Sequence, residues 1–522
     1  MPSTKSLNDI YPEDALQTQS KRWNELLSAF KGRYGRPADY VSRSPGRVNL
    51  IGEHIDYSLY DVVPMAVEQD VLLAVALTPA NGAPKVRLAN MDDRFADREF
   101  DIGEDGEVDI DATQHEWTNY FKAGMRGATE LLKKEGKEGV TKFNMDILAN
   151  GTVPAGGGMS SSAAFVCASA LATVKAAGQE TVDKKKLVET AVVSERSVGV
   201  NSGGMDQSAS VFAEQGSALH VSFLPELSAR AISFPRTHTP LTFVVSQSLV
   251  AADKHVTAPI HYNLRVVECS LAALVLAKIT NIKGGLSSDS SPLGVSLRTF
   301  ADAFFAQKKD PADEASTSDA LEIKKKQLEK LVQLVEDYLP QEEGYTREQI
   351  SELLGTPIDD LEKKYMTKFP VRADHFKLRQ RAYHVFSEAL RVFNFLALLD
   401  SETPQSESDS QTLLKDLGGL LNDTQDSCRD IHECSCPELD ELCKLARGAG
   451  AYGSRLTGAG WGGCSVHLVP GDKVEAVTKA WKEKYYMKRF PDMTEEKLKE
   501  AIVVSKPGSG SSLFLVEGMD SL

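Results

Sequence analysis

The sequence predicts an α+β protein built from two domains. Strand-like segments concentrate before about residue 250, helical segments dominate after about residue 260, and the 522-residue length exceeds what one hydrophobic core usually supports. We expect an N-terminal domain over residues 1–235 and a helix-rich C-terminal domain over residues 236–522. Apolar residues make up 42% of the chain and charged residues 25%, which excludes wholesale disorder.

The first half of the chain shows the residue pattern of a sheet with helices packed against it. β-branched and apolar runs separated by turn residues predict strands, and apolar residues at three- and four-residue spacing predict helices. The predicted strands cover residues 61–67, 70–77, 85–89, 142–148, 218–223 and 241–247. The predicted helices cover residues 118–134, 163–176 and 186–198.

The second half is mainly helical, with strands near its end. Predicted helices cover residues 262–278, 321–338, 380–399 and 412–423, and predicted strands cover residues 463–469 and 512–517. Residues 283–320 and 400–410 are rich in Ser, Asp, Gly and Pro. We therefore expect both stretches to be exposed loops or insertions rather than core.

Charge and hydropathy exclude several classes of function. A net charge of −15 argues against nucleic acid or an anionic membrane as the main partner. The chain contains no run of about 18 apolar residues, so the sequence predicts no membrane-spanning helix. The N-terminal residues carry neither a basic leader nor an apolar stretch, so we expect a cytoplasmic protein.

Four of the seven cysteines cluster at Cys428, Cys434, Cys436 and Cys443. Their spacing lacks a C-x-x-C pair, and no second Cys or His cluster supplies a tetrahedral zinc site. We interpret them as reduced thiols on a helix and the loop that leads to it.

The first segment with chemical content runs from Arg43 to Tyr57. Arg47, Glu53, His54 and Asp56 lie within ten residues of one another, amid Pro and Gly residues that predict a strand leading into a loop. Carboxylates and a histidine suit a polyhydroxyl ligand, because each carboxylate oxygen accepts hydrogen bonds from hydroxyl groups. A solvated loop with a salt bridge fits these residues equally well.

The second segment, residues 154–164, combines three glycines with three serines at the start of an apolar helix. Glycine allows backbone N–H groups to converge on an anion, and a helix N-terminus favours a phosphate. The pattern predicts a nucleotide phosphate site, although it is not a Walker loop, because no G-x-x-x-x-G-K-[ST] occurs in the chain. A flexible linker fits poorly, since apolar structure bounds the segment on both sides.

The third segment, Gly458–Gly463, matches G-x-G-x-x-G literally. It leads into a predicted strand rather than a helix, so the dinucleotide-binding interpretation fails its structural requirement. We expect instead a second glycine loop that closes over a ligand.

Two carboxylates complete the candidate set. Glu195 lies on a predicted helix, and Asp206 follows the Gly203-Gly204 turn. A carboxylate beside a glycine turn can bind Mg²⁺ or orient an attacking hydroxyl group, although each of these residues alone is more often a surface carboxylate.

Together the three segments resemble the three motifs of the GHMP small-molecule kinases, and the first resembles the galactokinase signature of that family. Trp117-Thr-Asn-Tyr-Phe-Lys and His261-Tyr-Asn-Leu-Arg-Val-Val-Glu resemble fungal galactokinases, as do the length and the Ser/Asp-rich insertion near residues 283–320. The resemblance implies a two-domain GHMP kinase-like fold with the active site in the cleft between the domains. It also implies MgATP-dependent phosphorylation of the anomeric hydroxyl of D-galactose to galactose 1-phosphate, in galactose catabolism by the Leloir route.

The resemblance also implies roles for individual residues. Asp206 would face the anomeric hydroxyl as a general base or orienting group, with Arg47 between that carboxylate and the γ-phosphate. The other positions that match sugar contacts are Glu53, His54, Asp56 and Tyr262. The positions that match ATP contacts are Gly156, Gly158, Ser160, Ser161 and Trp117, and those that match Mg²⁺ ligands are Ser162 and Glu195. Met159 stands where leucine is usual and Trp461 where many relatives have phenylalanine, and both remain bulky and largely apolar.

Two alternatives stay open within this resemblance. Fungi also have galactokinase-like signal transducers that bind galactose and ATP and sequester a transcriptional repressor. The intact Ser160-Ser-Ser-Ala-Ala164 run favours catalysis, because the best-known transducer lacks a Ser-Ala pair there. A protein with both activities, and so with a repressor partner, remains open. So does a kinase for N-acetylgalactosamine, because nothing in the sugar segment measures room for an acetamido group.

Overall fold

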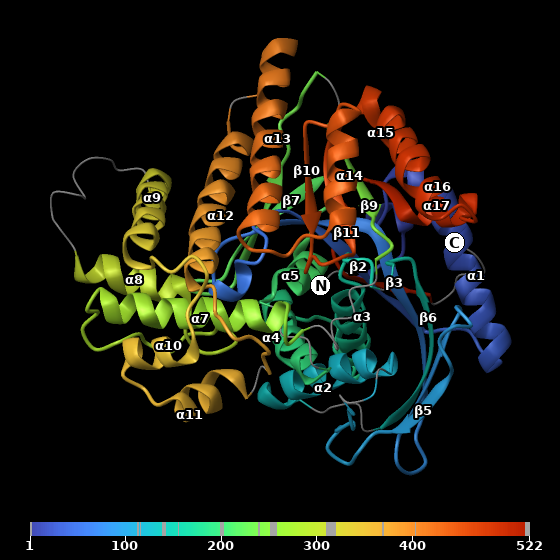
Figure 1. The fold of residues 1–522 in the computed structure, drawn as a ribbon. Helices are drawn as coiled ribbons and strands as arrows, with labels where there is room; N and C mark the ends of the chain where they lie inside the picture. The colour runs from blue at the N-terminus through green and yellow to red at the C-terminus, as the bar shows by residue number, and fades with distance from the viewer. Residues whose placement is uncertain are drawn as a thin grey trace.

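The structure is a computed structural model. It describes residues 3–111, 114, 116–137, 142–154, 156–198, 203–238, 241–250, 258–308, 320–367, 370–401 and 403–516. Figure 1 shows a large sheet at the centre of the molecule with helices on both of its faces.

A seven-stranded mixed sheet organises the N-terminal part. Its strand order is β1-β13-β2-β3-β6-β4-β5, and the pairs β1/β13 and β4/β6 are parallel while the others are antiparallel. The strands are β1 (Ser3–Thr4), β2 (Tyr40–Ile51), β3 (Val63–Pro79), β4 (Lys85–Asn90), β5 (Arg98–Asp101), β6 (Phe143–Gly151) and β13 (Ser512–Leu515).

Both faces of this sheet are covered, which explains why β2 is buried along its whole length. Alternate residues of β3 point to opposite faces. Leu72 and Ala74 belong to the same small core as Trp23 of α1 (Leu16–Tyr34) on one face, and Leu73 belongs to the main core, which includes Leu171 of α3, on the other. The helices of this second face are α2 (Thr118–Lys134), α3 (Ser161–Ala176), α4 (Lys184–Glu195) and α5 (Met205–Phe212).

A second, four-stranded antiparallel sheet organises the C-terminal part, in the order β10-β11-β9-β12. Helices cover it around a core that includes Trp481, Leu442 and Val244. The strands are β9 (Leu241–Gln247), β10 (Gly453–Thr457), β11 (Cys464–Pro470) and β12 (Ile502–Ser505). The neighbouring helices are α13 (Glu407–Asp430), α14 (Pro437–Gly448), α15 (Val474–Trp481), α16 (Met487–Arg489) and α17 (Glu495–Ala501).

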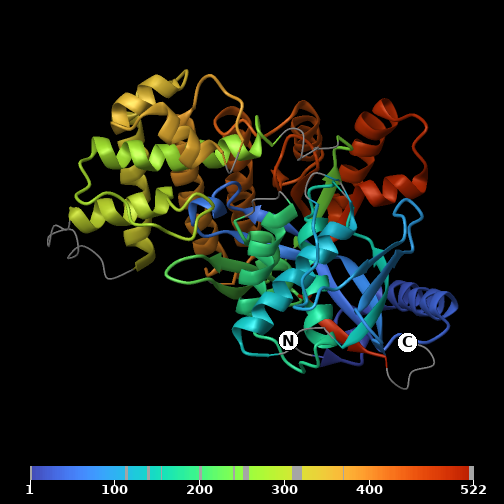
Figure 2. The ribbon, with the colours of Figure 1, turned by 90° about the horizontal axis from the view of Figure 1, so that it is seen from below.

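A group of helices lies at the opposite end of the molecule from α1, as Figures 1 and 2 both show. It contains α7 (Tyr262–Ile279), α8 (Leu297–Gln307), α9 (Ala320–Tyr338), α10 (Arg347–Leu354), α11 (Ile358–Leu361) and α12 (Leu378–Leu399). Contacts join α12 to α7, α9 and α13, so the group is continuous with the C-terminal part. A small hairpin of β7 (Ser217–Ser222) and β8 (Ser228–Ser233) completes the sheets.

The chain ends in the first sheet rather than the second. After β12, residues 506–511 lead to β13, which pairs antiparallel with β2. The C-terminal part therefore contributes a strand to the N-terminal sheet, a long-range pairing that the sequence pattern did not indicate. The division into domains at residue 235 stays a prediction.

The structure confirms the α+β class, with differences in individual elements. The expected strands 61–67 and 70–77 form one strand, β3. The expected loop over residues 283–320 is wrong for α8, because Ser296 caps this helix and Leu297, Phe300 and Phe304 bury its apolar face. Helix α13 begins at Glu407, inside the expected loop 400–410. Residues 309–319 lie outside the described part of the chain. Within the described ranges, no helix is long and apolar enough to cross a membrane.

Candidate active site

Arg47 and Asp206 form an ion pair at the centre of the candidate site. Arg47 Nε donates to Asp206 Oδ1 at 2.7 Å, and Arg47 Nη1 donates to the carbonyl oxygen of Gly158 at 2.8 Å. Arg47 lies on β2 and Asp206 in the first turn of α5, whose positive N-terminal end favours a carboxylate. The pair therefore links β2, α5 and the glycine-serine segment.

Strand β2 continues through Pro45 and Gly46, where the sequence predicted a transition to a loop. A register shift between Pro45 and Arg47 interrupts its pairing with β3, and such bulges re-aim side chains. A Cβ at position 46 would lie 2.7 Å from the carbonyl oxygen of Met159, closer than real Cβ contacts. Glycine at this position therefore lets the glycine-serine segment pack directly on β2.

Ser160 supplies the second contact to Asp206. Its hydroxyl donates to Asp206 Oδ2 at 2.6 Å, and it makes no side-chain cap on α3 although it occupies the N-cap position. The backbone of Ser160 is left-handed, with φ at 56°, which is uncommon for a residue with a side chain. Such backbone strain is typical of functional sites, and here it accompanies a hydroxyl that points at the carboxylate.

Burial and neighbouring charges shift the ionisation of this site. Burial alone would lower the pKa of Arg47, but the adjacent Asp206 carboxylate raises it overall, so Arg47 stays charged. Burial first, and then the Asp206 charge, raise the pKa of Asp56 to about 6. Gly203 lies directly against the Asp56 carboxylate and leaves no room for a side chain there. Two carboxylates thus share one buried region.

Glu53 is held by the third glycine segment. Arg455 Nη2 donates to Glu53 Oε2 in a fully buried ion pair, and the backbone N–H of Gly458 donates to the same oxygen at 3.0 Å. The backbone N–H of Glu53 donates in turn to Glu388 Oε1 of α12 at 3.1 Å. Glu53 therefore joins the first segment to β10 and to α12.

His54 uses both ring nitrogens in contacts within the protein. Nδ1 lies 3.1 Å from the Tyr57 hydroxyl, and Nε2 lies 2.9 Å from the carbonyl oxygen of Ala459. Its ring also contacts the rings of Tyr262 and Trp461, with centroids 5.4 and 5.6 Å away. The structure thus places His54, Tyr262 and the third glycine segment together.

A cavity of about 860 Å³ opens on the other side of the glycine-serine segment. Of the predicted nucleotide contacts, Trp117, Gly156 and Ser161 line it, and the predicted metal ligand Ser162 lines it too. Gly158 and Ser160 are not among its lining residues; the Gly158 carbonyl oxygen accepts from Arg47 and the Ser160 hydroxyl donates to Asp206.

Aromatic side chains form one wall of this cavity. Trp117 donates its indole N–H to the carbonyl oxygen of Ala96 at 3.0 Å, and its ring contacts Phe95 and Phe165 at 5.7 and 5.8 Å. Further lining residues that the sequence did not indicate include Arg94, Arg98, Tyr120, Lys499 and Glu500. The last two come from α17, far away in the sequence, so no local pattern could have placed them here.

The start of α3 gives the cavity its phosphate-binding potential. Ser161 and Ser162 open a helix of 16 residues, and both line the cavity. The first backbone N–H groups of a helix have no partner within it, and they carry partial positive charge. The cavity therefore joins an aromatic wall to an anion-binding helix N-terminus.

The third glycine segment packs against protein backbone, and its closure over a ligand stays a prediction. A Cβ on Gly458 would lie 2.7 Å from the carbonyl oxygen of Gly158, and one on Gly463 would lie 3.2 Å from the Gly158 Cα. A Cβ on Gly462 would lie 2.5 Å from the carbonyl oxygen of Val250. These glycines allow the C-terminal part to contact the glycine-serine segment closely.

The predicted Mg²⁺ ligands are Glu195 and Ser162. Glu195 is buried at the end of α4 and accepts a hydrogen bond from the Gln207 side chain of α5, while Ser162 lines the cavity. No group of three or more His, Cys, Asp or Glu side chains within the described ranges could hold a metal alone. Mg²⁺ usually takes one or two carboxylates and completes its shell with phosphates and water, so these residue types fit it.

Three buried groups behind the first segment went unnoticed in the sequence. Glu388 accepts from the backbone N–H groups of Gly52 and Glu53, and Arg391 helps hold its pKa low, at about 2. His384 contacts the carbonyl oxygen of Glu53 at 2.9 Å. Arg455 completes the set. All three lie hundreds of residues from the first segment, so only the fold reveals their contact with it.

The cysteine prediction is confirmed. Cys428 lies on α13 and Cys443 on α14, with Cys434 and Cys436 in the loop between the two helices, and all four are free thiols.

Comparisons with known proteins find similarity along almost the whole chain. The family model of the galactokinase galactose-binding signature matches residues 28–77, and the N- and C-terminal domain models of the GHMP kinases match residues 119–214 and 410–486. The chain is 41% identical to the galactokinase of Candida parapsilosis over 520 residues, which cover 99% of this chain and 98% of the relative. It is 41% identical to the galactokinase of Saccharomyces cerevisiae over 502 residues, which cover 94% of each chain.

A solved structure supports the fold. The Lactococcus lactis galactokinase, solved in complex with galactose, superposes with a TM-score of 0.63 at 22% identity, and the match covers 94% of this chain and 99% of that one.

Proposed function

The chain belongs to the galactokinase family of the GHMP kinases, and from this premise we propose that it phosphorylates the anomeric hydroxyl of D-galactose. ATP would be the phosphoryl donor, and the products would be galactose 1-phosphate and ADP. The observation that carries this proposal is the Asp206 carboxylate, held between Arg47 and Ser160 beside the N-terminus of α3.

Asp206 would align the sugar hydroxyl and accept its proton. The hydroxyl oxygen forms a bond to the γ-phosphorus, the bond from that phosphorus to the bridging oxygen of ADP breaks, and the proton passes to Asp206. Phosphoryl transfer spreads negative charge over the transferred oxygens, so fixed positive charge lowers the barrier. Arg47, which stays charged and contacts both Asp206 and Gly158, is placed to supply it.

Glu53, His54, Asp56 and Tyr262 would bind the sugar. A site that engages several hydroxyl groups discriminates against epimers, because a misplaced hydroxyl leaves a buried polar group without its partner. Since both ring nitrogens of His54 already have protein partners, its ring would offer the sugar only its carbon edge or face. Asp56, buried near the Asp206 carboxylate, is the stronger candidate for a hydroxyl acceptor.

The cavity would bind the nucleotide. Its aromatic wall, with Trp117, suits the flat apolar faces of adenine, and its other end leads to the start of α3. Gly156, Gly158, Ser160 and Ser161 would shape the phosphate path. Ser162 and Glu195 would hold Mg²⁺, which when bound offsets negative charge on the β- and γ-phosphates.

The cysteines support a proposal for the compartment. The four clustered cysteines remain free thiols, which fits a reducing environment, so we propose that the protein acts in the cytoplasm.

A coupled ADP-release assay tests the proposed function. Purified protein with MgATP would be given D-galactose, N-acetylgalactosamine, D-glucose or no sugar. Of these four conditions, we expect ADP release only with D-galactose, and one ADP should form for each sugar phosphate. Equal or faster turnover with N-acetylgalactosamine would assign the acetamido sugar instead. If no sugar caused ADP release while galactose and ATP still bound measurably, the result would point to a signal transducer that acts on a repressor.

A further inference from the structure

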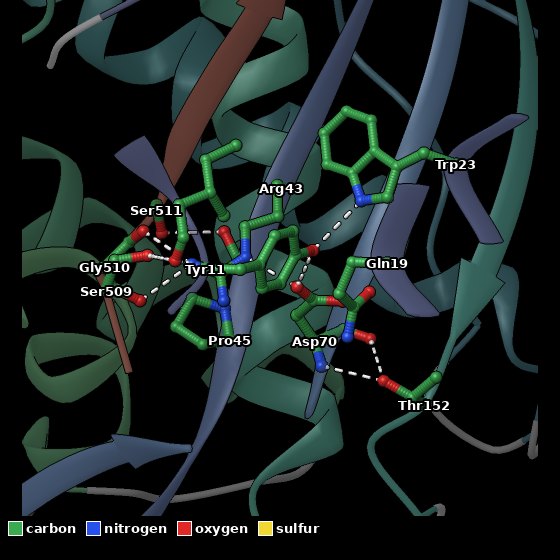
Figure 3. Close-up of polar contacts among 12 residues, drawn as sticks. Tyr11, Gln19, Trp23, Arg43, Pro45, Asp70, Thr152, Ser509, Gly510 and Ser511 are labelled. Atoms are coloured by element: carbon green, nitrogen blue, oxygen red, sulfur yellow. Dashed lines mark hydrogen bonds and ion pairs between the residues drawn. The ribbon is translucent and has the colours of Figure 1, made fainter. Parts of the chain in front are cut away.

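The segment between β12 and β13, residues 506–511, crosses from the C-terminal sheet to the N-terminal sheet. We name it the C-terminal strap. Figure 3 shows its last three residues, Ser509, Gly510 and Ser511, beside Arg43 and Pro45 of β2. Val503 of β12, the strand that precedes the strap, lines the proposed nucleotide cavity. The strap thus leads from a strand that borders this cavity to β2, the strand that carries Arg47.

The strap binds the C-terminal end of α5, the helix that carries Asp206. The backbone N–H and the hydroxyl of Ser511 both donate to the carbonyl oxygen of Ser210, each at 2.8 Å. The backbone N–H of Gly510 donates to the carbonyl oxygen of Ala213 at 2.8 Å. The last carbonyl groups of a helix have no partner within it, so the strap satisfies groups that would otherwise be unpaired in the interior.

The same residues tie α5 to β2. Ser210 donates its hydroxyl to the carbonyl oxygen of Pro45 at 2.8 Å. Because the Ser511 hydroxyl already donates to Ser210, the Ser44 hydroxyl donates to Ser511, with the oxygens 2.7 Å apart. Ser44, Ser210 and Ser511 are all buried.

This contact lies one helical turn from the ion pair. Asp206 and Ser210 are four residues apart, so they lie on the same face of α5. Arg47 and Pro45 are two residues apart on β2. The helix is therefore joined to the strand at two adjacent points, Asp206 with Arg47 and Ser210 with Pro45, and the strap fixes the second point.

The far side of the strap is held by a buried ionic cluster. Arg43 Nη1 donates to the carbonyl oxygens of Ser509 and Gly510 at 2.7 and 2.9 Å. Arg43 Nε donates to Asp70 Oδ2 at 2.7 Å (Figure 3), and both side chains are fully buried. The strap is thus held rigidly from β2 and β3 before it reaches α5.

The glycines of the strap allow this close approach. A Cβ on Gly508 would lie 2.6 Å from the carbonyl oxygen of Val67, and one on Gly510 would lie 2.6 Å from that of Val211. Neither contact is compatible with a side chain, so the strap lies directly on the backbones of β3 and α5.

We propose that Ser511 is a positioning residue for the phosphorylation reaction: it holds α5 in register along β2 and so fixes the Asp206 carboxylate against Arg47. The proposal rests on the proposed role of Asp206 in phosphorylating galactose. A displacement of about 1 Å in a reacting group can cost up to about 100-fold in rate. Loss of the Ser511 hydroxyl therefore affects the rate of transfer more than the binding of either substrate.

Ser511→Ala tests this, with Ser505→Ala as the matched control. Ser505 is as deeply buried, and its hydroxyl donates to the carbonyl oxygen of Lys506 at the other end of the strap, away from α5. We expect Ser511→Ala to lower kcat about tenfold and to change KM for galactose and for MgATP by less than about twofold. Ser505→Ala should keep kcat within about twofold of the parent protein. Equal kcat in the two variants would overturn the proposal.

Hydrogen exchange gives a readout that does not depend on activity. The amides of residues 203–213 should exchange faster in Ser511→Ala than in the parent protein, and at the parent rate in Ser505→Ala. Unchanged exchange in Ser511→Ala would overturn the positioning role even if the parent proved inactive, and parental inactivity alone would count only against the proposed function. If Ser511→Ala fails to fold, Ser210→Ala decides: it removes the hydroxyl bond to Pro45, together with a contact to the Cys167 thiol, and should also lower kcat at constant KM.

Discussion

Asp56 and Asp206 are two carboxylates in one buried region with different partners. Asp206 is held by Arg47 and Ser160, whereas Asp56 is buried near the Asp206 charge, and its pKa rises to about 6. Pairs of carboxylates in unequal environments commonly divide their roles. We infer that Asp206 acts on the reacting hydroxyl and that Asp56, when ionised, accepts a hydrogen bond from another sugar hydroxyl.

This assignment predicts how sugar affinity depends on pH. Asp56 is ionised above pH 6 and becomes protonated as pH falls through that value, so it loses its acceptor role on the acid side. KM for galactose should rise about tenfold between pH 7 and pH 5, as expected for a single group with a pKa of about 6. Initial rates over a galactose series at each pH measure it.

Two variants decide whether Asp56 is the group responsible. Asp56→Asn should have a raised KM that no longer depends on pH over this range. Asp61→Asn is the control, because Asp61 is also buried but bonds to His220 and Ser222. In this variant KM for galactose should rise at low pH as it does in the parent protein. If KM for galactose in Asp56→Asn still rose at low pH as in the parent protein, the titrating group would be a different residue.

The resemblance to a known family contributed most to the prediction of individual site residues. Composition and spacing alone identify Arg47, Asp56 and Asp206 only as polar residues near glycine turns, and such residues are also common as surface charges. Their convergence came from the resemblance, and the structure shows that it is real. Glu388 and Arg455, which hold the first segment from behind, carried no signal, because contacts between residues hundreds of positions apart leave no local pattern.

At the scale of elements, the third glycine segment supports the glycine-serine segment from the C-terminal side. Gly458 has φ at 90°, and a side chain there would press on the carbonyl oxygen of Gly158. That carbonyl oxygen also accepts the hydrogen bond from Arg47 Nη1. The close packing of two glycine segments therefore bears directly on the position of Arg47.

Gly458→Ala should consequently impair catalysis as well as stability. We expect a fall in kcat of at least about tenfold, since the side chain would displace the Gly158 carbonyl and with it Arg47. Gly284→Ala is the matched control, because Gly284 has a similar φ of 80° with open space around it. In Gly284→Ala only backbone strain is introduced, so its free energy of unfolding should fall by about 1 kcal/mol while its kcat stays at the parental value. Equal losses of kcat in the two variants would show that backbone strain, and not the contact with Gly158, is responsible.

Hydrophobic periodicity located most elements, and the exceptions have physical causes. Helix α2 and strand β9 match their predicted bounds, since each has a regular apolar pattern. Helix α8 was missed because Ser, Asp and Gly residues precede it, although Leu297, Phe300 and Phe304 bury its apolar face. Strand β13 was expected as a strand, but its pairing with β2 depends on residues more than 450 positions away, and no local pattern encodes such a partner.

At the scale of the whole molecule, a buried ionic cluster joins the two ends of the chain. Asp70 accepts from Tyr11 at 2.6 Å, from Arg22 at 2.6 Å and from Arg43 at 2.7 Å. Arg43 in turn holds the C-terminal strap. Burial would raise the pKa of Asp70, but Arg22 and Arg43 keep it below its usual value. Ionised Asp70 therefore stabilises the fold at any pH above the pKa that this carboxyl has in the unfolded chain. This stabilisation is lost as the pH falls through the lower pKa that it has in the folded protein.

Asp70→Asn should destabilise the protein by about 3–5 kcal/mol, because it leaves the buried Arg43 guanidinium and the partly buried Arg22 guanidinium without their counter-charge. Urea unfolding at pH 7, followed by circular dichroism, measures the change. Glu99→Gln serves as the control, since it removes an exposed pair with Lys85 and should leave the unfolding midpoint unchanged. Equal midpoints for Asp70→Asn and the parent protein would show that the cluster contributes little to the connection between the termini.

The most direct test of the whole account is the product formed by Asp206→Asn, followed by ³¹P NMR with galactose and MgATP, alongside calorimetry of galactose binding. The parent protein should form galactose 1-phosphate. Asp206→Asn should form it about 10²- to 10⁴-fold more slowly while its affinity for galactose changes only severalfold. Formation of galactose 1-phosphate at close to the parental rate by Asp206→Asn would contradict the central claim that this carboxylate, held by Arg47 and Ser160, acts on the anomeric hydroxyl.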